Sequence, residues 1–300
     1  MAKIKIVLHN IADMNVDCLV NPANEDLIPS GGTSKAIFMA AGFEEMSRAV
    51  KEFGSCGKGS CVMTPGFGLK AKAVLHVVGP VWNGGKNGEE RWLRSCYEKA
   101  MDMALRNGLF SICFPLISAG QNGFPLYRAW EIALRAAMNC KWDMDIYFAV
   151  IGRGEFQAGE EVLRQLREDE EILGNLNREE LWKHIEFLCS TRKIPWQGME
   201  QLEDSSFVLG YPKYPDGVFA IFRLLKPDYD YREHQDSWPD NLQPTDMTAS
   251  QIRTELTSIE RSERFCDGAI AGHIENGYLL KLLLRLDDLL KKHKNIIDYI

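Results

Sequence analysis

The stretch from residue 16 to residue 42 constrains the fold more than any other part of the chain. A short apolar run, Cys18 to Val20, is followed by two asparagines, Asn21 and Asn24, by a glycine pair and by a segment of small and apolar residues. This order is typical of a buried strand, a polar turn and the start of a helix. The sequence therefore predicts a strand–turn–helix unit of an α/β protein.

The glycine pair, Gly31 and Gly32, precedes a helix that we expect to open near Thr33. Glycines let the backbone come close to a large ligand, and the free N–H groups at a helix N-terminus attract anions, phosphate above all. The turn therefore predicts a site for a phosphorylated polar molecule. The alternative is that Asn21 and Asn24 only satisfy the backbone of the turn, and this stretch alone does not decide between the two.

A second unit of the same kind begins at Ser111. Residues 111–117 have the pattern of a buried strand, and a helix with apolar residues at helical spacing follows Pro125, which suits a first helical turn. The polar loop between them consists of Ser118, Ala119, Gly120, Gln121, Asn122, Gly123 and Phe124. In an open α/β sheet, ligands lie beyond the carboxyl ends of the strands. We therefore expect the loops after Asn24 and Ile117 to close on the same diphosphate.

Five motifs resemble, in the same order, those of macro domains, the modules that bind ADP-ribose. They are V-D-C-L-V-N-P-A-N, the glycine pair before A-I-F-M-A-A-G, K-G-S-C-V-M-T-P-G-F, L-H-V-V-G-P-V-W and P-L-I-S-A-G-Q-N-G-F-P. Five ordered motifs are far more specific than one glycine pattern. The resemblance covers about residues 3–167. It implies a three-layer α/β/α fold with a mixed central sheet, which binds ADP-ribose or an ADP-ribosylated protein.

The resemblance also implies ligand contacts residue by residue. Asn10, followed by Ile11, stands where macro domains carry an aspartate that accepts from the adenine amino group, and its amide oxygen can accept that bond without the charge. Phe156 stands where related domains stack an aromatic ring on adenine, although it suits a helix-start hydrophobic contact equally well. The predicted ligand-binding residues are Asn10, Ile11, Asn21, Gly31, Gly32, Thr33, Ser118, Ala119, Gly120, Gln121, Asn122, Gly123, Phe124 and Phe156.

Catalysis is implied by those macro domains that cleave ADP-ribosyl esters. They place an asparagine at the distal ribose and an aspartate, after the glycines, beside the attacking water. Asn24 matches the asparagine, but Ser34 stands at the aspartate position, and a hydroxyl is too weak a base to deprotonate water unaided. Hydrolysis of O-acetyl-ADP-ribose or of mono-ADP-ribosylated protein persists if the substrate's own phosphate holds the water and Asn24 and Phe124 orient the ribose.

Two alternatives remain open. Lys35 is a candidate reactive group that attacks or polarises C1 of the ribose, which requires a desolvated, neutral amine; a solvated side chain at a helix start is the simpler interpretation. Otherwise the protein is a reader that binds ADP-ribose without turnover, with its C-terminal part as a partner-binding module. The catalytic candidates are thus Asn24, Ser34 and Lys35.

Composition limits the remaining functions. The chain has 300 residues, 45% hydrophobic and 26% charged, which allows two domains of ordinary composition. Its sequence contains no apolar run long enough to span a membrane, and no signal-peptide core follows Met1. The eight cysteines are scattered without a C-x-x-C pair. We therefore expect a cytoplasmic protein with reduced thiols.

Charge is distributed unevenly along the chain. Residues 1–167 carry 19 Lys and Arg against 17 Asp and Glu, a net charge of +2, whereas residues 168–300 carry 16 against 25, a net charge of −9. Because binding to nucleic acid requires clustered cations that neutralise phosphates, a nucleic-acid partner is not expected.

The acidic part divides in two. Residues 168–180 lose hydrophobic periodicity, and we interpret them as an acidic linker after a first domain at 1–167. Residues 181–300 are expected to form a smaller, mostly helical α+β domain. Its segment R-F-C-D-G-A-I-A-G-H-I-E-N-G resembles that of an uncharacterised domain found in bacteria, alone or after macro domains. The sequence does not identify its partner.

Helical spacing predicts several elements. We expect one helix over residues 37–53, a helix at 181–189, a strand at 217–225 and a helix to about residue 264 that opens with a capping box. That capping box pairs Thr248 with Gln251. A last long helix from Phe265 carries an apolar stripe, the expected domain core, made of Ile270, Ile274, Leu279, Leu282, Leu283, Leu286 and Leu290.

Neither a metal site nor a cofactor is predicted. His76 lies in an apolar run and is expected to be a hydrogen-bonded core residue. The spacing of the cysteines and histidines in the C-terminal part fits no paired metal-binding motif; these are Cys189, Cys266, His184 and His273.

Overall fold

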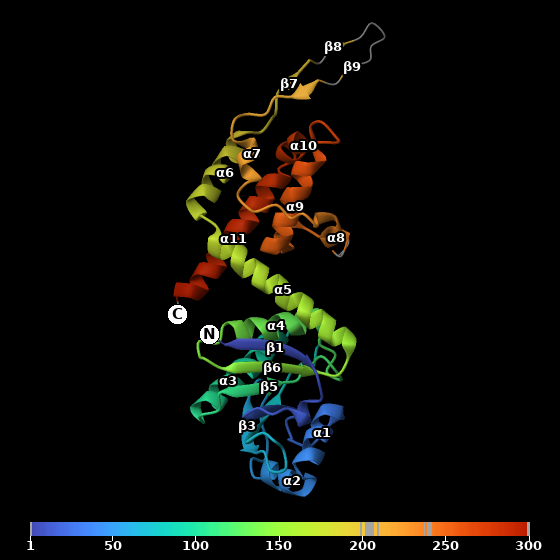
Figure 1. The fold of residues 1–300 in the computed structure, drawn as a ribbon, viewed down its shortest axis with the longest axis vertical. Helices are drawn as coiled ribbons and strands as arrows, with labels where there is room; N and C mark the ends of the chain where they lie inside the picture. Colours follow the sequence, from blue (N-terminus) through green and yellow to red (C-terminus); the bar gives the residue numbers. More distant parts are fainter. Residues whose placement is uncertain are drawn as a thin grey trace. The chain divides into compact units, whose positions relative to one another are not determined.

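The computed structural model describes residues 2–298 apart from residues 199, 202–206, 209, 237 and 239–241. The chain divides into two compact units, residues 1–166 and residues 167–300. Figure 1 shows the sheet and helices of the first unit in blue to green, and the second unit mostly in yellow to red.

The first unit is built on a six-stranded mixed sheet. Five strands run parallel, and the edge strand β3 pairs antiparallel with β4. Its central strands are apolar because both faces are covered, and every residue of β4 is buried. In sheet order the strands are β1 (Lys3–Leu8), β6 (Asp145–Val150), β5 (Ser111–Phe114), β2 (Cys18–Ala23), β4 (Ala73–Val78) and β3 (Cys61–Pro65).

Helices cover both faces of this sheet. Alternate residues of a strand point to opposite faces, so Cys18 and Val20 join one apolar core and Leu19 joins the other. The three-layer α/β/α fold is therefore confirmed. The first core is closed by α3 (Glu89–Arg106), α4 (Leu126–Met138) and the start of α5 (Arg153–Asn175), and the second by α1 (Gly31–Ala41) and α2 (Phe43–Lys51).

Asp17, the residue before β2, ties the starts of three strands together. Its carboxylate accepts hydrogen bonds from the backbone N–H groups of Phe110 and Ser111, both at 3.1 Å, at the start of β5. The same carboxylate pairs with Lys72 at 2.7 Å, just before β4. The bond from Lys72 is the largest influence on the pKa of Asp17, which lies below its ordinary value. β2 is therefore fixed between its two neighbours.

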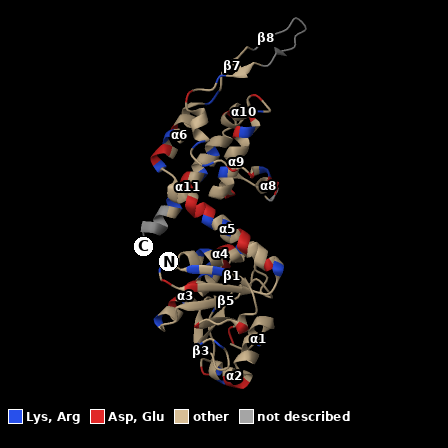
Figure 2. Cartoon of the chain, viewed as in Figure 1, with Lys and Arg blue, Asp and Glu red and all other residues tan. Residues whose placement is uncertain are grey.

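The acidic stretch 168–180, interpreted as a linker, is largely helical. α5 continues through most of it, and α6 (Arg178–Ser190) follows; Figure 2 shows acidic positions in red along α5. Leu173 is buried in the core of the second unit. The apolar period of this helix is hard to see in the sequence because a charged residue, Asp169, occupies a buried position. It is 7% exposed, and its carboxylate accepts a 2.8 Å hydrogen bond from the N–H of Ser250.

Helices make up most of the second unit, as predicted. Its core contains all seven residues of the predicted apolar stripe. Further helices are α7 (Val218–Ile221), α8 (Tyr231–Asp236), η2 (Pro244–Asp246), α9 (Ala249–Ser262), α10 (Ala269–Glu275) and α11 (Tyr278–Asp298). Short antiparallel pairs join β7 (Trp196–Gln197) to β10 (Tyr211–Pro212) and β8 (Glu200–Gln201) to β9 (Phe207–Val208). The predicted capping box is present at the start of α9.

Three predicted elements were wrong, each beside a glycine with positive φ, a conformation that interrupts a helix. Residues 37–53 form two helices, α1 and α2, because Gly42 between them has a φ of +100°. The expected last long helix is likewise split into α10 and α11, with Gly277 at φ +74° between them. Residues 217–225 contain the short helix α7 instead of a strand, and it begins after Gly217 at φ +100°.

We expect Asp17→Ala to lower the free energy of unfolding by about 2 kcal/mol, because two backbone donors lose a charged acceptor. Asp13 lies in the 3-10 helix η1 (Ile11–Asp13) and is exposed, so Asp13→Ala is the matched control and should cost about 0.5 kcal/mol or less. Chemical denaturation of the three proteins measures both effects. Equal losses in the two variants would contradict the role given to Asp17.

Candidate ligand-binding site

A cleft of about 300 Å³ lies at the carboxyl ends of β2, β4 and β5. The loop after β2 and the first turn of α1 contribute Asn24, Gly31, Gly32, Thr33 and Ser34 to its wall. The loop after β5 contributes Ile117, Ser118, Gly120, Gln121 and Asn122. The structure therefore brings the two loops that the sequence singles out onto one cleft.

Strand order explains why these loops meet. β2 lies between β4 and β5 and runs parallel to both. After β2 the chain passes through α1, α2 and β3 to β4 on one side, and α3 then returns it to β5 on the other side. Where successive connections lead to opposite sides of a strand, a crevice is left at the carboxyl ends of the strands. Open sheets bind their ligands in this crevice.

Asn24 holds the first loop in shape. Its Oδ1 accepts a 3.0 Å hydrogen bond from the N–H of Ile28, and its Nδ2 donates to Oγ of Ser30 at 3.4 Å. Asn24 thus satisfies turn backbone and also lines the cleft. Ser30 precedes α1 without a side-chain cap, so the first N–H groups of this helix, including those of Gly31 and Gly32, have neither an intrahelical partner nor a cap from Ser30.

Hydrogen bonds within the protein hold the second loop. The N–H of Phe124 donates to the carbonyl of Ser118 at 3.0 Å, and Nδ2 of Asn122 donates to the carbonyl of Pro80 at 3.1 Å. The N–H of Trp82 returns a 2.9 Å bond to the carbonyl of Asn122. Ser118 has a φ of +65°, which is uncommon for a residue other than glycine and is often found at functional sites.

The two loops approach each other at Gly31 and Gln121. A β-carbon placed on Gly31 would lie 3.3 Å from Oε1 of Gln121, and Gly31 has a φ of +73°. This position therefore favours glycine for its conformation and for its close contact. Gly32 and Gly120 also line the cleft, but a β-carbon on either would meet open space. Side chains can be introduced at these two positions without a clash at the β-carbon.

Three buried polar atoms at or near the cleft have no hydrogen-bond partner in the part of the chain that the structure describes: Oγ of Ser34, Oγ of Ser118 and Oδ1 of Asn21. Buried polar atoms are almost always paired. Ser34 lines the cleft from the first turn of α1, and Ser118 lines it from the loop after β5. Two unpaired hydroxyl groups at one cleft indicate a place where a ligand or water completes the hydrogen bonding.

Asn21 lies within the sheet and is not among the residues that line the cleft. It is 1% exposed, and its Nδ2 donates a 3.0 Å hydrogen bond to Nδ1 of His76, whose Nε2 lies 2.9 Å from Oγ1 of Thr64. The prediction that His76 is a hydrogen-bonded core residue is confirmed. Burial lowers the pKa of His76 to about 4, so its ring is neutral at pH 7.

Lys35 is exposed on α1 and does not line the cleft. Ser34, one residue earlier, is buried and does line it. Of the three catalytic candidates, the structure therefore brings Asn24 and Ser34 together at the cleft and leaves Lys35 outside it.

The residues predicted at the adenine lie after β1 and β6 instead of in the cleft wall. Asn10 is exposed, and its Oδ1 accepts a 3.2 Å hydrogen bond from the N–H of Ala12 at the start of η1, while Ile11 is buried. Phe156 is half-buried near the start of α5 and packs on the first core. Because β1, β6, β5 and β2 are parallel, these residues follow strands that end at the same edge of the sheet as the cleft.

Three other residues of the second loop do not line the cleft: Ala119, Gly123 and Phe124. Phe124 is 2% exposed, and the centroid of its ring lies 4.5 Å from that of Trp82. Gly123 has a φ of +67°, which the turn of this loop requires. These residues therefore support the conformation of the loop without forming part of the cleft wall.

Sequence reasoning missed Lys58, which lines the cleft and is exposed. Its Nζ lies 6.0 Å from the centroid of the Trp92 ring. Lys58 opens the motif K-G-S-C-V-M-T-P-G-F, but the surrounding glycines fit no phosphate-loop pattern, so only its place in the ordered motifs marks it. Glu25 lines the cleft as well.

Two structural findings concern other kinds of site. In the described ranges, no helix is both long and apolar enough to cross a lipid bilayer. Within the same ranges, no group of three or more His, Cys, Asp and Glu side chains is arranged to hold a metal ion.

The first unit is thus an α/β domain of three layers, α/β/α, with a cleft where the connections from β2 diverge to β4 and β5. The family profile described as Macro domain matches residues 20–133. The chain belongs to the macro domain family. A second profile, a family of unknown function (DUF6508), matches residues 175–292, as expected for an uncharacterised C-terminal domain.

Individual relatives agree with this assignment. A macro domain-containing protein of Caldanaerobacter subterraneus is 43% identical over 136 residues, which are 44% of this chain and 78% of the relative. A protein of Enterobacter named O-acetyl-ADP-ribose deacetylase is 42% identical over 135 residues, covering 44% of this chain and 75% of the relative. The solved Oceanobacillus iheyensis macrodomain with ADP is 31% identical, with a TM-score of 0.53, over 55% of this chain and 92% of that structure.

We expect His76 to make the first unit less stable in acid. Because its pKa is lowered from 6.5 to about 4 in the folded protein, the unfolded chain binds a proton between these two pH values that the folded chain does not bind. The free energy of unfolding therefore falls as the pH decreases from 6.5 to 4, by up to about 3 kcal/mol from this group. Chemical denaturation at several pH values measures the loss, which should be smaller in His76→Gln. Parallel pH profiles for the two proteins would refute this prediction.

Proposed function

We propose that the first unit binds ADP-ribose, free or attached to a protein, in the cleft between its two loops. The observation that carries this proposal is one cleft that is lined by the N-terminus of α1 and by two unpaired hydroxyl groups. These belong to Ser34 on α1 and to Ser118 on the loop after β5. Helix N-terminal N–H groups and hydroxyl groups are suited to the oxygens of a diphosphate. A solved relative described with ADP and a relative named O-acetyl-ADP-ribose deacetylase support this choice of ligand.

We place the adenine end of the ligand along the same edge of the sheet. From the cleft at β5, the edge continues to the ends of β6 and β1, where Phe156 and Asn10 follow. Ile151, directly after β6, is 81% exposed and Leu8, at the end of β1, is 46% exposed. These exposed apolar side chains lie at the strand ends that precede Phe156 and Asn10. They favour contact with a flat ring at this edge.

We further propose slow hydrolysis of ADP-ribosyl esters, from mono-ADP-ribosylated protein or O-acetyl-ADP-ribose. Asn24 lines the cleft and is the residue proposed to position the distal ribose, while Ser34 supplies a neutral, unpaired hydroxyl group and no base. The water is therefore oriented by the substrate's phosphate, and the rate enhancement comes from positioning. The exposed place of Lys35 favours the solvated interpretation of its side chain over attack on C1.

Ser34 also favours a second candidate function, that of a reader. Position 34 has no carboxylate to accept a proton from water, although the carboxylate of Glu25 also lines the cleft. In that case ADP-ribose is bound without turnover, and the C-terminal domain is a partner-binding module. Incubation of stoichiometric protein with mono-ADP-ribosylated substrate separates the two functions, because a reader leaves the label in place.

Gly32→Glu is expected to weaken ADP-ribose binding by about 100-fold, equivalent to roughly 3 kcal/mol, because it adds a negative charge where the diphosphate is proposed to bind. Gly32→Gln has nearly the same size without the charge and is the matched control, with a loss of about tenfold or less. Open space around this position makes both variants compatible with the fold. Calorimetric titration with ADP-ribose measures the affinities, and tight binding by Gly32→Glu would place the diphosphate elsewhere.

Asn24→Ala is expected to slow release of label from mono-ADP-ribosylated protein by about tenfold or more, while its affinity for ADP-ribose falls by about threefold, because orientation matters most in the transition state. Lys35→Ala, at an exposed position on α1, serves as the control and should retain both properties. Single-turnover assays together with calorimetry give the two quantities. If Lys35→Ala abolished release while Asn24→Ala did not, positioning by Asn24 would be the wrong mechanism.

A further inference from the structure

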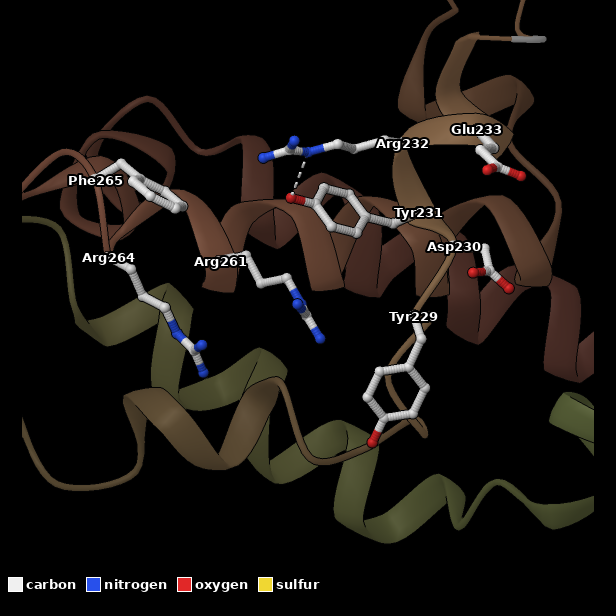
Figure 3. Close-up of a pocket in the computed structure, with 8 residues that line it drawn as sticks. All are labelled: Tyr229, Asp230, Tyr231, Arg232, Glu233, Arg261, Arg264 and Phe265. Atoms are coloured by element: carbon white, nitrogen blue, oxygen red, sulfur yellow. Dashed lines mark hydrogen bonds between the residues drawn. The ribbon is translucent and has the colours of Figure 1, made fainter.

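The second unit contains a pocket of about 360 Å³ that none of the preceding functions uses. It lies between the start of α8, with the two residues before it, and the segment at the C-terminal end of α9, and Figure 3 shows its side chains. Three guanidinium groups, of Arg232, Arg261 and Arg264, share the pocket with the rings of Tyr229, Tyr231 and Phe265. Its volume lies within the range of pockets that bind small ligands.

The arginines carry charge that the described residues do not neutralise. Arg261 and Arg264 form no ion pair with any described residue, and Nε of Arg232 donates a 3.1 Å hydrogen bond to the neutral hydroxyl group of Tyr231. This lack of pairing stands out because residues 168–300 contain 25 carboxylate side chains against 16 cationic ones. Unpaired guanidinium groups that share one pocket suit a phosphate, which they can bind through two parallel hydrogen bonds.

Two carboxylates, of Asp230 and Glu233, also line the pocket. In Figure 3 they lie to the right of the Tyr231 ring, while the guanidinium groups of Arg232, Arg261 and Arg264 lie to its left or below it. Neither carboxylate is within ion-pair distance of these arginines in the described part of the chain. Positive charge is therefore concentrated at one end of the pocket.

Aromatic rings form the rest of the pocket. Tyr229 is 77% exposed and Phe265 is 82% exposed, so both rings are accessible to a ligand. Cζ of Arg261 lies 5.7 Å from the centroid of the Tyr229 ring and 5.6 Å from that of Tyr231. These cation–π contacts hold the guanidinium group beside the two rings. Exposed rings next to guanidinium groups are the components with which proteins stack a nucleobase.

Residues 229–231, which carry the two tyrosines at the start of α8, are held by a buried carboxylate. Asp228 is 5% exposed, and its carboxylate accepts hydrogen bonds from Oγ1 of Thr254 at 2.5 Å and from the N–H of Asp230 at 3.1 Å. Nδ1 of His234 lies 2.7 Å from the same carboxylate, and the N–H of Asp228 donates to Oγ1 of Thr257 at 2.9 Å. This segment is thus fixed to α9, which brings the rings and the arginines together.

We propose that this pocket binds a mononucleotide, with the phosphate on Arg261 and Arg264 and the base on the exposed rings. The volume matches one nucleotide and not a chain of them. The net charge of −9 over residues 168–300 repels a longer polyanion, which disfavours an oligonucleotide. The second unit is therefore a nucleotide-binding module in its own right.

Calorimetric titration of the full chain with AMP tests this site. Gly32→Glu is used as the background, so that the cleft of the first unit does not contribute. We expect one AMP to bind per chain, and adenosine and inorganic phosphate each to bind at least about tenfold more weakly, because each retains only half of the contacts. Absence of AMP binding in this background would overturn the proposal, as would tighter binding of a phosphotyrosine peptide or an oligonucleotide.

Variants locate the binding. Arg261→Ala and Arg264→Ala are each expected to weaken AMP binding about tenfold or more, and Tyr229→Leu to weaken AMP more than inorganic phosphate. Arg192→Ala, which removes an exposed arginine of the same unit outside the pocket, is the control and should leave the affinity unchanged. Arg264 is exposed, so its variant keeps the fold even if Arg261→Ala does not. Unchanged AMP affinity in Arg264→Ala would show that the pocket is not the site.

Discussion

The hydrogen bonds of the Asp17 carboxylate are the interaction on which the candidate cleft depends. Asp17 binds the first N–H groups of β5 and the lysine before β4, so it fixes the amino ends of both neighbours of β2. Strands that are aligned at one end and run parallel end at the same edge of the sheet. A carboxylate at the opposite end of β2 therefore determines that the loops after β2 and β5 lie beside each other.

Local patterns predicted the first unit well because its strands and loops follow strong rules. Buried parallel strands are continuous apolar runs, and Gly31 and Gly123 have the positive φ that their turns require. The motifs that contain Asn24, Ser34 and the residues of the second loop were sufficient to single out these positions. They could not identify Lys58, since the position of a single lysine in a turn depends on contacts between distant segments.

The errors have a common physical origin in positions where tertiary contacts outweigh local preference. Gly42 and Gly277 adopt positive φ and divide helices whose apolar spacing continues across them. Asp169 breaks the apolar period of α5 without breaking the helix, because its carboxylate is satisfied by the N-terminus of α9. Residues 217–225 look like a strand from composition, but Val218, Ile221 and Leu225 are buried at helical spacing. Buried polar contacts and glycine conformations are not visible in hydrophobic periodicity.

If ADP-ribose binds as proposed, the neutral side chain at Ser34 also bears on how long it stays bound. A carboxylate at that position would repel the negative charges of a bound diphosphate, whereas a hydroxyl group can donate a hydrogen bond to them. In the proposed complex this exchange slows dissociation of substrate and product alike. On this proposal, the cleft would release its ligand more slowly than the same cleft with a carboxylate at position 34.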